Sequence, residues 1–301
     1  SRYDFIKFLH KLNCNLNKIK PDIVHSFLDS PNIFLSLTKL FFHKYILIWG
    51  IRSSKMQLKK YSFLRQVTKI LENCLSKIPN GIVYNSYNAK NNLKFIFNNN
   101  YSVIQNGIDT DYFIPSNAYR YKYRDLWMLD ESIFLIGMVA RFDPKKDHEN
   151  FIQAARIISK EIRSIKFVLI TNKKNHLNKL INSYGLSDYF IIETGISETN
   201  KIYPAFDINT LSSAFGEGFP NVIGEAMACG LPVVSNDIGD NKYIIGNTGV
   251  VISCDTLEKI EIQIRSMLEK SQHISKNTNI RERIISNFSV TSLNFSATKR
   301  A

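Results

Sequence analysis

The sequence predicts an α/β fold in which two units of parallel strands follow one another along the chain. Short runs rich in Ile, Val and Phe recur, and each is followed by a longer stretch whose apolar residues have helical spacing. The 301 residues suffice for two packed domains, and 44% hydrophobic with 22% charged residues is typical of a globular chain. No repeat of roughly 20 to 50 residues is visible, which excludes solenoids and propellers.

Ten segments have the length and composition of strands. In the first half of the chain we expect them at Asp22–Phe27, Tyr45–Ile51, Gly81–Ser86 and Ser102–Gln105. In the second half we expect them at Phe134–Ala140, Lys166–Thr171, Phe190–Glu193, Ile208–Ser212, Pro232–Asn236 and Val250–Ser253.

A polar stretch, Asp109–Asp130, separates the two groups of strands. It has no strong apolar period and contains Pro115, which is typical of a linker with a short helix. We therefore expect a first domain over residues 1–115 and a second over 116–288. Residues 289–301 are polar and weakly patterned, and we expect a tail there.

The net charge of +13 lies almost entirely in the first part of the chain. Residues 1–130 hold 19 basic and 8 acidic side chains, whereas residues 131–301 hold 20 and 18. Such a surplus attracts anions, so nucleic acid and acidic lipid are early candidates as partners. No nucleic-acid recognition motif accompanies it, and we expect no nucleic-acid partner. As a hypothesis, the amino-terminal half approaches an anionic membrane surface or a lipid-diphosphate acceptor.

Cysteine usage and hydropathy narrow the cellular setting. The four cysteines have neither metal-ligand nor redox spacing, which predicts no metal site and favours a reducing, cytoplasmic setting. The most apolar stretch, Ile33–Ile51, is interrupted by Lys39, His43 and Lys44. We therefore expect no transmembrane helix.

The most informative stretch is Ser212–Asn236, which reads SSAFGEGFPNVIGEAMACGLPVVSN. Pro220 suits a first helical turn and Gly230 a left-handed cap, so we expect a helix from about Pro220 to Cys229. The N-terminus of such a helix points backbone N–H groups beyond the strand ends, where parallel sheets bind anions. This stretch therefore predicts a phosphate or diphosphate site.

Two carboxylates, Glu217 and Glu225, stand on either side of this helix start with seven residues between them. Phosphates would repel a carboxylate, so the pair favours hydrogen bonding to a neutral, hydroxyl-rich group such as a sugar or a ribose. Taken alone, the pattern equally allows Glu217 to be a partner of the helix dipole and Glu225 a solvated surface residue.

Three cations follow the apolar strand Phe134–Ala140. Arg141 and Lys146 lie where a diphosphate would be bound, and they could stabilise the charge of a leaving nucleoside diphosphate without a metal. The alternative is a solvated cluster that caps the next helix. We adopt that interpretation for Lys145 alone.

These residues resemble the donor domain of the family-four retaining glycosyltransferases with the GT-B fold, also described as glycosyl transferases group 1. The resemblance rests on ARFDPKKDH and on EGFPNVIGEAMACGLPVV, in which Glu217 and Glu225 match the family's paired-glutamate motif. The segments KPDIVHSF, WGIRSS, VYNS and VIQNGIDTDYF agree with it, so it covers about Lys20–Ser253. It implies two Rossmann-like domains, of which the N-terminal one is incomplete here.

The resemblance also implies an activity. A hexosyl group would pass from a nucleotide-diphosphate sugar, UDP- or GDP-linked, to an acceptor hydroxyl with retained anomeric configuration, without a metal or a cofactor. By the same resemblance, Arg141 and Lys146 hold the diphosphate, Glu217 contacts the donor sugar, and Glu225 binds the ribose hydroxyls. The donor-binding backbone is that of Gly218, Phe219, Pro220, Asn221 and Val222.

The acceptor implied by the resemblance is a glycan or a lipid-linked sugar, in cell-surface polysaccharide or lipopolysaccharide synthesis at the inner face of the membrane. We expect Arg52 and Ser53 to line the acceptor side. The family's first strand with its glycine-rich loop and its last crossing helix have no counterpart here, so we expect a chain that is truncated. Two alternatives within the fold stay open, a catalytically weak donor-binding pseudoenzyme and a nucleotide-sugar epimerase.

Overall fold

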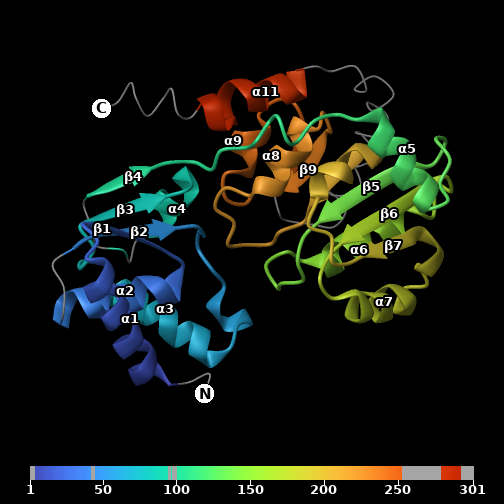
Figure 1. Cartoon of the computed structure of the whole chain (residues 1–301). Coiled ribbons are helices and arrows are strands. Elements are labelled where there is room, and N and C mark those ends of the chain that lie inside the picture. Colours follow the sequence, from blue (N-terminus) through green and yellow to red (C-terminus); the bar gives the residue numbers. More distant parts are fainter. Residues whose placement is uncertain (1–3, 42–44, 94–95, 97–99, 253–278, 293–301) are drawn as a thin grey trace. The chain divides into compact units, whose positions relative to one another are not determined.

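The computed structural model describes the chain apart from residues 1–3, 42–44, 94–95, 97–99, 253–278 and 293–301. It divides into two compact units, Ser1–Gln105 (unit 1) and Asn106–Ala301 (unit 2), each built on a parallel sheet with helices (Figure 1). The predicted α/β class and its two Rossmann-like sheets are confirmed.

The division falls upstream of the boundary that we expected near Pro115. The reason is local packing within unit 2. The side-chain N–H of Asn106 donates to Asn221 Oδ1 at 2.7 Å, and Ile108 pairs as a β-bridge with Ser289. Ser289, the first residue of the expected tail, is thereby buried, while residues 293–301 lie outside the described part.

Unit 1 contains a four-stranded parallel sheet in the order β1-β2-β3-β4. Its elements are α1 (Phe5–Ile19), β1 (Ile23–Phe27), α2 (Asp29–Phe41), β2 (Ile46–Ile51), the single-turn helix η1 (Leu58–Lys60), α3 (Phe63–Leu75), β3 (Gly81–Tyr84), α4 (Tyr87–Asn92) and β4 (Tyr101–Val103). The centre of its core is formed by side chains of β2 and β3, among them the fully buried Leu47 and Trp49.

Unit 2 contains a six-stranded parallel sheet in the order β10-β9-β8-β5-β6-β7. Its elements begin with α5 (Asn117–Leu126), β5 (Phe134–Val139), α6 (His148–Ile158), β6 (Ile165–Ile170), α7 (Lys174–Ser183), η2 (Ser187–Tyr189), β7 (Phe190–Glu193), η3 (Thr199–Lys201) and η4 (Tyr203–Ala205). They continue with β8 (Ile208–Leu211), α8 (Asn221–Ala228), β9 (Val233–Asn236), α9 (Asn241–Ile245), β10 (Val250–Ile252) and α11 (Asn279–Phe288). All ten strands lie within one or two residues of the predicted segments, of which only Ser253 falls outside the described residues.

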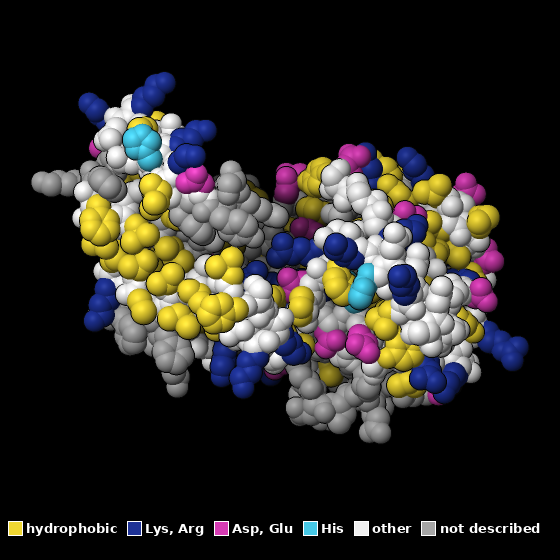
Figure 2. Space-filling view, turned by 90° about the horizontal axis from the view of Figure 1, so that it is seen from below, with side chains coloured by type: hydrophobic (Ala, Val, Ile, Leu, Met, Phe, Trp, Pro, Cys, Tyr) yellow, Lys and Arg dark blue, Asp and Glu magenta, His cyan; other side chains and the backbone are white. Residues whose placement is uncertain are grey.

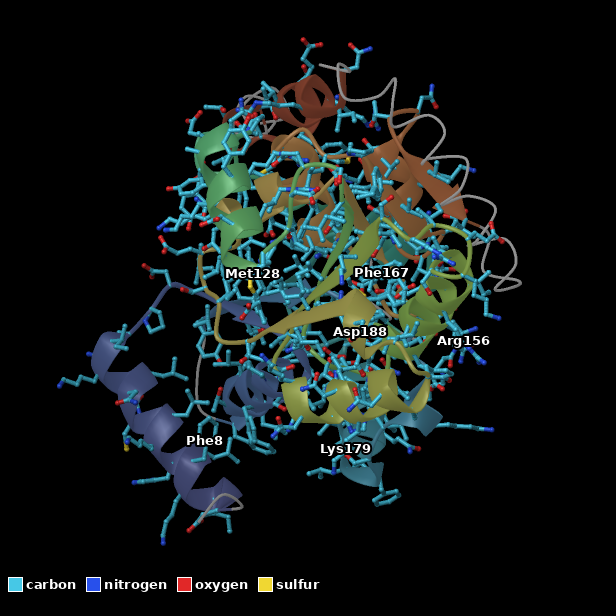
Figure 3. The ribbon with its side chains drawn as sticks, turned by 90° about the vertical axis from the view of Figure 1, so that its right-hand side faces the viewer. Phe8, Met128, Arg156, Phe167, Lys179 and Asp188 are labelled. Atoms are coloured by element: carbon cyan, nitrogen blue, oxygen red, sulfur yellow. The ribbon has the colours of Figure 1, made fainter. Side chains whose placement is uncertain are left out.

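The strand order of unit 2 reverses at β5. From β5 the chain passes outward to β6 and β7, then returns to the other side of β5 as β8. This reversal leaves the carboxyl ends of β5 and β8 side by side, and ligands of open α/β sheets bind at such switch points. The sheet itself is densely packed: Phe167 lies within it, whereas Arg156 and Lys179 lie on the surrounding helices (Figure 3).

No helix in the described parts of the chain combines the length and the apolar character that a membrane span requires.

Candidate functional site

Two loops of unit 2 meet at the carboxyl ends of β5 and β8. The backbone N–H of Ala214 donates to the carbonyl of Lys145 at 2.8 Å. The hydroxyl of Ser212 donates to the carbonyls of Lys146 and Asp147, at 2.9 and 3.0 Å. These bonds join segments that are more than sixty residues apart in sequence, and they bring the cations of the first loop to the glutamate of the second.

An ion pair between Lys146 and Glu217 forms the centre of this junction. Lys146 Nζ lies 2.6 Å from Glu217 Oε1, and the hydroxyl of Ser213 donates to the same oxygen at 2.8 Å. The Glu217 side chain is only 5% exposed and that of Lys146 12% exposed. A carboxylate so deeply buried is stable only with such partners, because burial by itself disfavours its charge.

The second cation of the loop corrects our interpretation of Lys145. We expected a solvated charge, but its side chain is only 16% exposed and its Nζ lies 3.8 Å from Glu217 Oε2. The cause is the hydrogen bond from Ala214, which holds the Lys145 backbone against the second loop. Burial lowers the pKa of Lys145, and the nearby Lys146 adds to this while Glu217 opposes it.

The charge state of Glu217 follows from the same contacts. Burial alone would raise the pKa of its carboxyl group, but the neighbouring Lys146 and Lys145 and the donated hydrogen bonds hold that pKa below its usual value. Glu217 is therefore an ionised acceptor at neutral pH, shielded by two ammonium groups.

Glycines and one asparagine hold the Glu217 loop in shape. Gly216 and Gly239 adopt positive φ angles of 74° and 66°. A Cβ at Gly239 would lie 2.6 Å from the carbonyl oxygens of Glu217 and Gly218, so no other residue fits there. From the end of β9, the side-chain N–H groups of Asn236 donate to the carbonyls of Ser212 and Ser213, each at 3.1 Å.

Arg141, the other predicted cation, lies two residues after the end of β5 and is exposed. It forms no ion pair with any residue that the structure describes. The next residue is anchored, because the Phe142 backbone N–H donates to Asn172 Oδ1 at 2.7 Å. The exposed guanidinium group is thus carried by a fixed backbone near the carboxyl end of β5 and remains available to an anion.

The start of α8 lies beside this loop and differs in detail from expectation. Pro220 is the N-cap residue rather than part of the first helical turn, and its extended backbone leads into Asn221. The Phe219 side chain is buried against Phe288 in the core, so only its backbone could serve a ligand. Asn221 is exposed, and the first amides of a helix have no partner within it.

Glu225, on the second turn of α8, has a partner that sequence reasoning missed. The hydroxyl of Tyr203 donates to Glu225 Oε2 at 2.9 Å. Burial raises the pKa of the Tyr203 phenol and so does the nearby carboxylate, which keeps the phenol protonated as a donor. Burial likewise raises the pKa of Glu225.

Three contributors to this geometry were not singled out from sequence, namely Ser213, Asn236 and Tyr203. The first two stand at strand ends beside the switch point, which is the signal that could have found them. The acceptor-side candidates, Arg52 and Ser53, belong to unit 1, where the Arg52 guanidinium lies over the Phe27 ring at 4.7 Å. The described residues hold no cluster of side chains suited to a metal ion.

Residues 133–270 match the family described as Glycosyl transferases group 1. Unit 2 therefore carries a glycosyl transferases group 1 domain. The two motifs on which the resemblance rested begin in the loops after β5 and β8 of this unit. The fold agrees: HepE of Anabaena, solved in complex with UDP-glucose, superposes with a TM-score of 0.83 at 18% identity, over 97% of this chain and 81% of HepE. The chain has the GT-B fold.

Two curated relatives are similar in sequence to this chain. A UDP-Gal:alpha-D-GlcNAc-diphosphoundecaprenol alpha-1,3-galactosyltransferase of Escherichia coli is 26% identical over 63% of this chain and 50% of its own length. An N-acetylgalactosamine-N,N'-diacetylbacillosaminyl-diphospho-undecaprenol 4-alpha-N-acetylgalactosaminyltransferase of Campylobacter jejuni is 24% identical over 88% of this chain and 71% of its own length. The chain spans half or less of the first curated relatives that it matches.

Proposed function

We propose that the chain is a retaining glycosyltransferase that moves a hexosyl group from a nucleoside-diphosphate sugar to an acceptor hydroxyl. The observation that carries this proposal is the Lys146–Glu217 ion pair at the switch point of a parallel sheet. It puts a cation for phosphate and a carboxylate for sugar hydroxyls within 2.6 Å of each other. Arg141 and the amides around Gly218 and Val222 supply further anion-binding groups beside them.

Donor binding would rearrange this ion pair. A diphosphate oxygen competes with Glu217 for the Lys146 ammonium, because both are anionic acceptors of charge-assisted hydrogen bonds. When Lys146 turns to the diphosphate, Glu217 is released to accept hydrogen bonds from the sugar. The second ammonium, Lys145, 3.8 Å from Glu217, limits the repulsion between carboxylate and phosphate.

Transfer needs only charge stabilisation and a proton acceptor. The bond from the anomeric carbon to the diphosphate oxygen breaks with its electron pair on oxygen, and the acceptor oxygen forms its bond to that carbon. In the same-face route to retention, the acceptor proton passes to the departing diphosphate, whose charge Arg141 and Lys146 stabilise. In the alternative route the Glu217 carboxylate attacks the anomeric carbon as the diphosphate departs, and the acceptor oxygen then displaces this carboxylate while the acceptor proton passes to the bound diphosphate. Both routes leave the protein unchanged and require no metal.

The proposed substrate class is based on what the similar proteins bind or act on. HepE was solved with UDP-glucose, and the E. coli and C. jejuni relatives are named for diphosphoundecaprenol-linked acceptors. We therefore propose a UDP- or GDP-linked donor and a glycan or lipid-linked acceptor, in cell-surface polysaccharide synthesis at the cytoplasmic face of the membrane.

The test begins with donor binding by the full chain. Thermal shift and calorimetry with UDP, GDP and their sugars should show selective stabilisation by one nucleotide, worth about 2.7 kcal/mol at a hundredfold excess over Kd. Arg141→Ala should weaken that binding about 10- to 100-fold, because it removes charge-assisted hydrogen bonds. Arg163→Ala, at an exposed arginine before β6, is the matched control and should bind as wild type.

Two results would contradict the proposal. One is the absence of stabilisation by any nucleoside diphosphate. The other is binding that Arg141→Ala and Arg163→Ala weaken equally, which would place the anion away from the β5 loop. Product analysis then separates transfer from epimerisation, since an epimerase returns an isomeric nucleotide sugar whether or not an acceptor is present.

A further inference from the structure

His148, the first residue of α6, is a buried polar side chain beside the proposed donor site. It is only 2% exposed, and it follows the loop 141–147, which carries Arg141 and Lys146. Its ring nitrogen Nε2 lies 3.2 Å from the carbonyl oxygen of Ala140. A carbonyl oxygen only accepts, so Nε2 carries a proton and donates the hydrogen bond. This bond joins the residue that follows the loop to the residue that precedes it.

The His148 ring is held in one protonation state. Burial lowers the pKa of the ring to about 4, so the ring is neutral near pH 7. Its Nδ1 is buried and has no hydrogen-bond partner among the residues that the structure describes. A second proton on Nδ1 would therefore create a buried N–H group without an acceptor, which is costly. The neutral ring acts here as a donor of one hydrogen bond.

Both chain neighbours of Arg141 are in contact with His148. Ala140 accepts the hydrogen bond from Nε2, and the Phe142 ring lies beside the imidazole with 5.5 Å between the ring centroids. The backbone of Phe142 is also anchored, through its hydrogen bond to Asn172 Oδ1. Arg141 thus stands between two fixed residues, which restricts the directions in which its exposed side chain can project.

The far end of the loop is held by a different group. The hydroxyl of Ser212 donates to the carbonyls of Lys146 and Asp147. These bonds fix the part of the loop that carries Lys146, whereas His148 fixes the part that carries Arg141. Loss of the His148 ring should therefore displace Arg141 more than Lys146.

Overall charge cannot replace such local positioning in unit 2. This unit carries 23 basic and 22 acidic residues. Figure 2 shows Lys, Arg, Asp and Glu side chains interspersed over its surface. A nearly balanced surface has no strong net charge that would attract an anion to one place. Binding of a diphosphate thus depends on how each nearby cation is oriented.

We propose that His148 is a positioning residue for Arg141, an inference that rests on the proposed donor site. It acts through the hydrogen bond to Ala140 and the ring contact with Phe142. A guanidinium group binds phosphate oxygens through N–H groups that lie in one plane, so its affinity depends on its orientation. His148 sets that orientation without touching the diphosphate.

The test is calorimetry of the full chain with UDP and with GDP. His148→Leu removes the donor but keeps an apolar side chain, and it should weaken binding of the preferred nucleotide about five- to tenfold. His148→Gln, whose amide N–H can reach the place of Nε2, should stay within about twofold of wild type. Ile158→Ala is the matched control for lost stability, because Ile158 is also 2% exposed and lies at the other end of α6. It should lower the melting temperature and leave nucleotide binding unchanged.

Double variants separate positioning from a general loss of stability. The effect of Arg141→Ala on nucleotide affinity should be about five- to tenfold smaller in the His148→Leu background than in the wild type, because the guanidinium group is already misplaced. Lys146→Ala should have the same effect in both backgrounds. Equal effects of Arg141→Ala in the two backgrounds would overturn the inference, as would a His148→Gln variant that binds as weakly as His148→Leu.

Amide hydrogen exchange without nucleotide distinguishes failure of this inference from failure of the proposed function. In His148→Leu, exchange of the Phe142 amide should be about tenfold faster than in the wild type, while the amides of β6 keep their protection. Unchanged exchange at Phe142 would overturn the inference whether or not a nucleotide binds. Faster exchange at Phe142 in a chain that binds neither UDP nor GDP would support the role of His148 in the loop and contradict the proposed donor site.

Discussion

Each unit of the chain contains a buried Lys–Glu ion pair, and the two pairs differ in the elements that supply them and in the residues that surround them. In unit 1, Lys69 and Glu72 are three residues apart on one helix, and Glu72 is fully buried. In unit 2, Lys146 and Glu217 come from two loops far apart in sequence and meet at the carboxyl edge of the sheet. In the first pair, Asn32 donates to Glu72 and Asp29 lies beside Lys69, whereas the second pair borders the exposed start of α8.

This difference shows that a buried ion pair by itself does not indicate a ligand site. The Lys69–Glu72 pair determines how a helix is oriented, since its hydrogen bonds are all used within the unit. The Lys146–Glu217 pair stands where two loops converge at a switch point, next to the exposed Arg141 and a helix N-terminus. Position in the topology, more than burial, therefore distinguishes the pair that we propose to be functional from the pair that orients a helix.

The largest effect is expected for Glu217→Gln in the unit 2 pair. Sugar transfer should fall about 10²- to 10³-fold, because the amide cannot supply the negative charge that the transition state requires. Affinity for the free nucleoside diphosphate should stay equal or rise, because the change removes the carboxylate that competes for Lys146. Release of nucleoside diphosphate in the presence of acceptor, together with calorimetry, measures the two quantities.

Glu149→Gln provides the control for that prediction, since Glu149 is an exposed glutamate in the first turn of α6. It should keep transfer and binding at wild-type values. If Glu217→Gln loses binding and transfer in equal proportion, Glu217 holds the loop rather than the sugar.

The next largest effect is expected for Glu72→Gln in the unit 1 pair. It should lower the free energy of unfolding of unit 1 by about 3 kcal/mol, because Lys69 keeps only Asp29, 3.5 Å away, as a charged partner. The chain has two tryptophans, Trp49 in unit 1 and Trp127 in unit 2. Urea unfolding followed by Trp49 fluorescence, in a Trp127→Phe background, reports this unit alone.

A double variant tests whether the Lys69–Glu72 pair orients α3 or also contributes net stability. Lys69→Met with Glu72→Leu removes both charges and should cost less than Glu72→Gln alone, because no buried charge is left without a partner. Neither change should alter nucleotide binding by unit 2. A larger loss in the double variant would mean that the pair contributes net stability rather than orientation alone.

The third effect depends on pH and is specific to unit 2. Burial lowers the pKa of His148 to about 4, from a usual value of 6.5. The folded state thus favours the neutral ring, so its contribution to stability is complete above pH 6.5 and is lost as pH falls toward 4. The lowered pKa of His148 corresponds to roughly 3 kcal/mol of stability.

Amide hydrogen exchange in α6 measures this contribution. Protection of the His148–Ile158 amides should fall between pH 6.5 and 4 in the wild type, after correction for the intrinsic exchange rate. His148→Gln should show a smaller fall, because glutamine does not titrate. Identical pH profiles would show that other groups cause the acid loss.

The strands were predictable because their signal is local, an apolar run of fixed length before a helical period. Glu217, Lys146 and Arg141 were singled out because they stand at strand and helix ends, and the structure brings Lys146 and Glu217 into contact. The interpretation of Lys145 was wrong because its burial depends on the hydrogen bond from Ala214, a contact across the sheet edge that no local pattern records. The orientation of α3 was likewise not predictable, since its spacing alone does not show which face is buried.

The smallest effect is expected for Tyr203→Phe, which tests whether the hydrogen bond to Glu225 serves a ligand or only the fold. Removing the hydroxyl deprives Glu225 of a 2.9 Å donor and lets its side chain turn. UDP affinity should fall about fivefold, equivalent to about 1 kcal/mol, if Glu225 accepts hydrogen bonds from the ribose. If Glu225 binds the ribose, 2′-deoxy-UDP binds more weakly than UDP to the wild type. Its affinity then also falls less than that of UDP when Tyr203 is replaced by Phe.

Tyr121→Phe is the control, because this tyrosine of α5 is 59% exposed. It should bind both nucleotides as the wild type does. If Tyr203→Phe instead weakens UDP and 2′-deoxy-UDP equally, the hydroxyl acts through the packing of η4 against α8. Glu225 would then resemble Glu72, a carboxylate that holds one helix in place, more than it resembles Glu217. The ribose would have to be bound by other groups of unit 2.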